Sequence, residues 1–124
     1  MNKIIFDTET AGLPKNWEAS EDDTNSWPRV VEIAWMIIDK DNNIISTKEF
    51  IIKPDNFLIP LEASNIHGIT TERAHLEGLN IIKVLAEFAE DLSESDLVIA
   101  HNIDFDFPVI NCEFKRIKMK NKLH

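Results

Sequence analysis

Two kinds of hydrophobic pattern alternate along the chain. Short apolar runs predict buried strands at residues 4–6, 30–39, 44–53 and 97–100. Both alternate sets of side chains in residues 30–39 are apolar, which predicts a strand covered on both faces. The polar cluster at residues 39–43 is a turn signal, so the second and third strands are expected to form a hairpin.

Apolar positions at helical spacing predict the remaining elements. Residues 61–72 are expected to hold one short helical turn that ends at Gly68, with Thr70 or Thr71 capping the next helix. The order is strand, hairpin, helix, strand, helix, and the long crossover makes the first and last strands parallel. We therefore predict an α/β fold in which helices flank a mixed sheet. Two longer helices are predicted at residues 80–92 and 106–120.

A polar, acidic stretch bounded by prolines, residues 14–29, is predicted to be a long loop. Loops of this length inside compact domains are often functional. Its two indole rings, Trp17 and Trp27, could stack on nucleic-acid bases or could fix the loop to the body of the domain. We favour the second interpretation, because indole rings are mostly buried.

Length, charge and cysteine content restrict the class of protein. A chain of 124 residues predicts a single domain over residues 1–124. The net charge of −9 argues against a basic patch that grips phosphates by charge alone, but not against an enzyme that meets phosphates through carboxylate-bound metal ions. The lone cysteine, Cys112, fits a reducing, cytoplasmic setting. We expect neither a secretory leader nor a membrane span.

Acidic residues follow both strands that are predicted to be parallel. Asp7 and Glu9 are two residues apart at the end of the first run, so their side chains point to the same side. Asp106 follows the last strand and begins the last predicted helix. Sites form at the carboxyl ends of such strands, and clustered carboxylates suit Mg²⁺ or Mn²⁺. The simpler alternatives are a solvated acidic strand end and a helix N-cap at Asp106.

These motifs resemble the DnaQ-like, or DEDD, 3′→5′ exonucleases, the family of the DNA polymerase III epsilon proofreading subunit, ribonuclease T and oligoribonuclease. The first family motif is matched by residues 6–13, Phe-Asp-Thr-Glu-Thr-Ala-Gly-Leu, and the second by His101-Asn102, two residues, and Phe105-Asp106. Residues 31–34 are similar to the family's second strand, and residues 66–70 match a further signature. On this register Asp104 falls on a variable position.

The resemblance implies a ribonuclease H-like fold and a specific chemistry. Asp7, Glu9 and Asp106 would hold two divalent metal ions, Mg²⁺ or Mn²⁺, against the terminal phosphodiester, and water would release a nucleoside 5′-monophosphate. The substrate would be the 3′ end of a single-stranded nucleic acid, with DNA favoured over RNA and both left open by the sequence, and a polymerase could be a partner. The last nucleotide would be cradled by five residues: Thr10, Ala11, Gly12, Leu13 and His67.

One family feature is expected to be absent. The third motif supplies a fourth carboxylate and a general base, and the chain ends after the helix that carries Asp106. We therefore expect a truncated domain that lacks the last strand and helix, has impaired activity or is completed by self-association, and exposes residues 97–100 as an edge strand. Two other functions stay open: a non-catalytic nucleic-acid-binding or interaction module on the same scaffold, and a small metal-binding signalling domain, which the hairpin disfavours.

Overall fold

Strands and helices follow one another in the predicted order in the computed structural model, which describes residues 1–120. Residues 121–124 of the predicted domain lie outside the described part. Every helix in that part is too short or too polar to span a bilayer. The elements are β1 (Lys3–Thr10), β2 (Val30–Ile38), β3 (Ile44–Ile51), α1 (Leu61–His67), α2 (Thr71–Glu77), α3 (Ile81–Ser93), β4 (Leu97–Ala100) and α4 (Ile103–Arg116).

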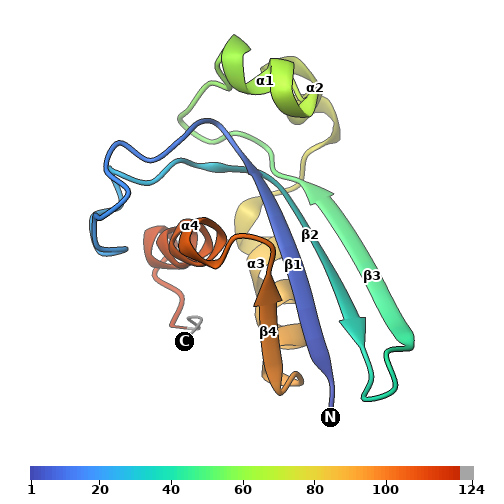
Figure 1. The fold of residues 1–124 in the computed structure, drawn as a ribbon. Coiled ribbons are helices and arrows are strands. Elements are labelled where there is room, and N and C mark those ends of the chain that lie inside the picture. Colours follow the sequence, from blue (N-terminus) through green and yellow to red (C-terminus); the bar gives the residue numbers. More distant parts are fainter. Residues whose placement is uncertain (121–124) are drawn as a thin grey trace.

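The strands form one mixed sheet in the order β3-β2-β1-β4 (Figure 1). β2 pairs antiparallel with both β1 and β3, so the predicted hairpin is confirmed. β4 pairs parallel with β1 from Lys3–Leu97 to Phe6–Ala100, as the crossover predicted. The sheet with its helices confirms the α/β, ribonuclease H-like architecture.

The main core lies between one face of the sheet and helices α3 and α4 (Figure 1). Phe88 of α3 contacts the rings of Phe6 and Trp35, at centroid distances of 5.3 and 4.9 Å. A second, smaller core, built around Val31, Ile69 and Ala74, attaches α1 and α2 to one end of the sheet. This second core places α1 beside the end of β1, where the candidate site forms.

The opposite face of the sheet is more open, which corrects the prediction for residues 30–39. Ala34 and Met36 of β2 are only half-buried, because no described helix packs on their side. Apolar residues at both alternate sets of positions show that the strand is hydrophobic. They do not show whether another element covers each of its faces. β4 is the edge strand expected for residues 97–100, and its Leu97 and Ile99 are 44% and 37% exposed.

Three element boundaries also differ from prediction by three or more residues. α4 ends at Arg116, four residues before the predicted end at residue 120. β1 continues through Thr10, so Asp7 and Glu9 lie within the strand and not after it. α4 begins at Ile103 with Asn102 at the N-cap position, so the alternative that made Asp106 the N-cap is wrong. Asp106 instead lies in the first turn of the helix.

The caps of the short helices agree with the sequence patterns. Gly68 ends α1 in the left-handed conformation, at φ 78°, which L side chains adopt at a cost. The Thr70 side chain accepts a hydrogen bond from the Arg73 backbone N–H and caps α2. The position of Gly68 therefore fixes where His67 leaves the helix.

The long loop, residues 14–29, is fixed along α4. Glu113 of α4 is fully buried and accepts hydrogen bonds from the Arg29 guanidinium and from the Val30 backbone N–H, the latter at 2.7 Å. Arg116 donates to the carbonyl of Trp27, whose ring is only 3% exposed. Trp27 therefore fixes the loop as predicted, whereas Trp17 is half exposed and the burial predicted for it is wrong.

Candidate active site

The candidate carboxylates lie near the point at which β4 stops pairing with β1. β4 pairs with β1 only as far as Phe6, so the edge of β1 is free from Asp7 onward. Strand alternation places Asp7, which is exposed, and Glu9, which is half-buried, on the open face of the sheet. Thr8 between them is buried on the helix-covered side. The turn after β4 leads directly into α4, whose first turn contacts Thr8 through Asp106.

Asp106 reaches the same edge from the helix side. It is 2% exposed, and its Oδ1 accepts a hydrogen bond from the Thr8 hydroxyl at 2.6 Å. Its Oδ2 accepts a hydrogen bond from the Asn102 backbone N–H at 3.2 Å. Both bonds fix the carboxylate of α4 against the residue that separates Asp7 from Glu9.

The three carboxylates act on one another electrostatically. Partial burial, followed by repulsion from Asp106, raises the pKa of Asp7 above its ordinary value. Partial burial and then repulsion from Asp7 raise the pKa of Glu9. A bound cation would relieve this repulsion, and the donors are the hard oxygens that Mg²⁺ and Mn²⁺ prefer. The donor set therefore fits the metal that the family resemblance implied.

The carboxylates are not closed into a ready-made cage. Among residues 1–120, no three His, Cys, Asp or Glu side chains are grouped closely enough to hold a metal ion as they stand. Asp106 is turned towards Thr8, on the side of β1 opposite to Asp7 and Glu9. The structure thus brings the predicted metal ligands to one edge without joining them.

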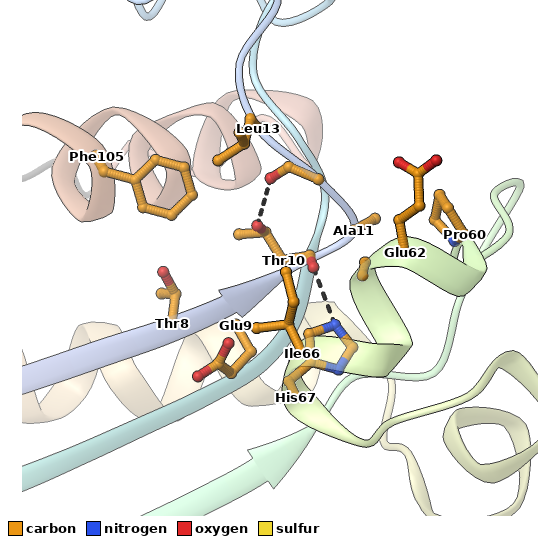
Figure 2. Close-up of a pocket in the computed structure, with 12 residues that line it drawn as sticks. Thr8, Glu9, Thr10, Ala11, Leu13, Pro60, Glu62, Ile66, His67 and Phe105 are labelled. Atoms are coloured by element: carbon orange, nitrogen blue, oxygen red, sulfur yellow. Dashed lines mark hydrogen bonds between the residues drawn. The ribbon is translucent and has the colours of Figure 1, made fainter.

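A pocket of about 450 Å³ opens beside Glu9 (Figure 2). Phe105 projects into it from α4, and Ile66 and His67 border it from α1. All five residues predicted to cradle the last nucleotide line this pocket, together with Glu9, whereas Asp7 and Asp106 do not. The five are Thr10, Ala11, Gly12, Leu13 and His67.

His67 joins the pocket wall to the end of β1. Its Nδ1 accepts a hydrogen bond from the Ile69 backbone N–H at 3.1 Å, which leaves Nε2 to donate to the Thr10 carbonyl at 3.1 Å. This assignment gives a neutral imidazole whose two nitrogens are both used. His67 therefore holds α1 against β1 in addition to lining the pocket.

Six further lining residues were not predicted: Thr8, Pro60, Glu62, Ala63, Ile66 and Phe105. Glu62 and Ile66 are four residues apart on α1, as are Ala63 and His67, so helical spacing could have indicated this face. Phe105 directly precedes Asp106, and whether its side chain reaches the pocket depends on where α4 begins. That position was predicted incorrectly.

A pair of glutamates lies next to the site on the open face. Glu32 of β2 lies opposite Glu9 in the β1–β2 register. Partial burial, a hydrogen bond with the Glu49 carboxyl and repulsion from Glu49 raise the pKa of Glu32 to about 7. The neutral form of Glu32 is therefore favoured, because a second negative charge beside Glu49 would be repelled.

Comparison with known proteins gives a consistent result. A family model described as an exonuclease, of the RNase T type, matches residues 4–124. The DNA polymerase III subunit epsilon of Buchnera aphidicola subsp. Schizaphis graminum is 36% identical over 120 residues, and that of Treponema pallidum is 29% identical over 119 residues. These alignments cover 94% and 96% of this chain but 47% and 49% of the relatives. The chain therefore spans about half the length of these epsilon subunits.

Solved structures show the same fold. A moderately thermophilic exonuclease I from Methylocaldum szegediense matches with a TM-score of 0.75 and 26% identity, over 94% of this chain and 24% of that one. E. coli exonuclease I, in a complex with a dT13 oligonucleotide, matches with a TM-score of 0.76 and 24% identity, over 95% of this chain and 24% of that one. The second match supports the fold alone.

Proposed function

Because this chain belongs to the exonuclease family, we propose that it is a metal-dependent 3′→5′ exonuclease that removes nucleoside 5′-monophosphates from single-stranded DNA. The observation that carries the proposal is the pocket beside Glu9, next to the edge of β1 where Asp7 and Asp106 also lie. At about 450 Å³, it falls within the size range of small-ligand sites.

The pocket walls suit the terminal nucleotide. Leu13, Ile66 and Phe105 offer apolar surface to the base and sugar. The hydroxyl of Thr10 donates to the Gly12 carbonyl at 2.7 Å, and His67 donates to the Thr10 carbonyl. These two bonds keep the turn after β1 in one shape, so that the nucleotide would meet a preformed wall.

The carboxylates are proposed to act on the phosphate. Asp7, Glu9 and Asp106 would hold two divalent ions, Mg²⁺ or Mn²⁺, which when bound supply an activated water and stabilise charge on the phosphate. Without a cation the same three groups repel the substrate, so DNA binding at this edge is expected to require metal. Thr8 and Asn102 position Asp106. Because the ligands are not closed into a cage, we expect slow turnover.

The partners are proposed from the chemistry and from the relatives. Two relatives are named as DNA polymerase III subunits, which supports a proofreading role beside a polymerase and DNA rather than RNA as the substrate. A single buried thiol, Cys112, fits work in the cytoplasm. Self-association through the open face of the sheet is a further proposal.

A second function is favoured by one specific observation. Both oxygens of Asp106 already accept hydrogen bonds within the protein, on the side of β1 away from Asp7 and Glu9. If this arrangement persists in the presence of metal, the chain is a DNA-binding module that does not cleave.

Digestion of a single-stranded DNA oligonucleotide, labelled at its 5′ end, separates the two functions. With Mn²⁺ or Mg²⁺ we expect a ladder that shortens from the 3′ end and is lost in Asp7→Asn. Asp41→Asn is the matched control, because Asp41 is an exposed carboxylate in the turn between β2 and β3, outside the pocket. Binding without cleavage would support the non-catalytic module, and cleavage that survives Asp7→Asn would contradict the proposed site. The same sequence as RNA tests the preference for DNA.

A further inference from the structure

The two tryptophans of the long loop, residues 14–29, have different environments. Trp27 is 3% exposed, and its ring N–H donates to the Ser20 carbonyl at 3.3 Å. Trp17 is 50% exposed and meets Trp27 edge to face, at a centroid distance of 6.4 Å. The burial of Trp27 therefore explains how the loop is attached to the domain. Trp17 is half exposed to solvent, so attachment of the loop does not explain its position.

Trp17 also contacts the wall of the pocket. Its ring lies 5.6 Å from that of Phe105, tilted by 45°, and Phe105 lines the pocket beside Glu9. On its other side Trp17 lines an open hollow that includes Ile103 and Phe107 of α4. The two rings thus link the pocket and the hollow across the first turn of α4.

We propose that Trp17, together with Phe105, stacks on the base of the penultimate nucleotide, an inference that rests on the proposed function. With the terminal nucleotide in the pocket and its phosphate at the carboxylates, the strand leaves past Asp106. Phe105 is the neighbour of Asp106 on α4, so the next base meets the Phe105–Trp17 pair first. Aromatic rings stack on any base and need no sequence preference.

The charge around the hollow favours a base over a phosphate. Glu21 and Asp104 line it, and a phosphate placed there would be repelled. Binding at this position would then depend on stacking and not on ion pairs, which suits a chain with a net charge of −9. The phosphates would face solvent.

The test combines a protein change with a DNA change. The affinity of 5′-fluorescein-labelled (dT)₆ is measured by fluorescence anisotropy with Ca²⁺, for the native chain, Trp17→Ala and Trp17→Phe. Each protein is also titrated with oligonucleotides that are abasic at the second or at the fifth position from the 3′ end. For intact DNA and for DNA abasic at the fifth position, Trp17→Ala is expected to lose roughly 5-fold or more in affinity. Trp17→Phe should lose less.

For DNA that lacks the penultimate base, Trp17→Ala and the native chain should bind equally, because the stacking partner is already absent. A loss of equal size on all three oligonucleotides would overturn the inference, since it would report a displaced loop. No loss on any of them would overturn it as well. Failure of the native chain to bind any oligonucleotide would instead refute the proposed function, and the inference with it.

Discussion

One of the two hydrogen bonds that orient Asp106 is a buried bond between side chains. The donor is the Thr8 hydroxyl and the acceptor is the Asp106 carboxylate, 98 residues away in sequence. Thr8→Val keeps the shape of the side chain and removes the donor. Since hydrogen bonds to charged groups contribute about 1.5–3 kcal/mol, we expect the free energy of unfolding in urea to fall by that amount. Thr8→Ser should retain most of it, and equal loss in both variants would contradict this role.

Glu32 makes stability depend on pH. Its pKa is about 7 in the folded chain against an ordinary value of 4.5, so the folded state holds an extra proton between these values. The stability contributed by that proton is present at low pH and is lost as the pH rises through 7. In metal-free buffer, Glu32→Gln should therefore lose less stability than the native chain between pH 5.5 and pH 8. Urea unfolding at both pH values measures this, and parallel losses would refute it.

Individual residues of the site were predictable to different degrees. The two-residue spacing placed Asp7 and Glu9 on one face correctly, because side-chain alternation is a local property. The contact of Asp106 with Thr8 was not predictable, since it depends on where β4 stops pairing with β1. The role of the carboxylates as metal ligands stays a prediction.

At the scale of elements, alanine substitutions at the glycines that follow α1 and α2 are expected to destabilise the protein by different amounts. Gly68 has φ 78° and open space around it, so Gly68→Ala should cost about 1 kcal/mol of stability through backbone strain alone. A methyl group on Gly78 would collide with the Ala74 carbonyl oxygen and the Lys53 backbone. Gly78→Ala should therefore cost more, roughly 3 kcal/mol. Thermal unfolding ranks the two variants, and the reverse order would contradict this packing.

Elements with strong local signals were predicted well. β4 was predicted at its observed bounds, and the predicted helix 80–92 lies within one residue of α3 because Asn80 is a good N-cap. The start of α4 was placed three residues late, since the acidic residue before Pro108 has the pattern of an N-cap. In the structure that acid accepts a bond from Asn102 instead, and the helix begins earlier.

At the scale of the whole molecule, one face of the sheet is left largely uncovered. Ile5 of β1 lies between Met36 of β2 and Ile99 of the edge strand β4, so apolar side chains form a row across it. Exposed apolar rows beside a free strand edge favour association. We expect a concentration-dependent dimer in sedimentation velocity, weakened in Ile99→Lys. Ala86→Lys, at an exposed position of α3 on the opposite side of the sheet, is the control. A monomer at all concentrations would refute this expectation.

The central claim is that Asp7, Glu9 and Asp106 form one metal site beside the nucleotide pocket. Calorimetric titration with Mn²⁺ tests it most directly, with Asp7→Asn, Glu9→Gln, Asp106→Asn and the control Asp41→Asn. We predict that each of the first three weakens binding by about tenfold or more, through the loss of one of the ligand carboxylates. Asp41→Asn should bind as the native chain does. Absence of Mn²⁺ binding to the native chain, or an equal loss in Asp41→Asn, would contradict the account.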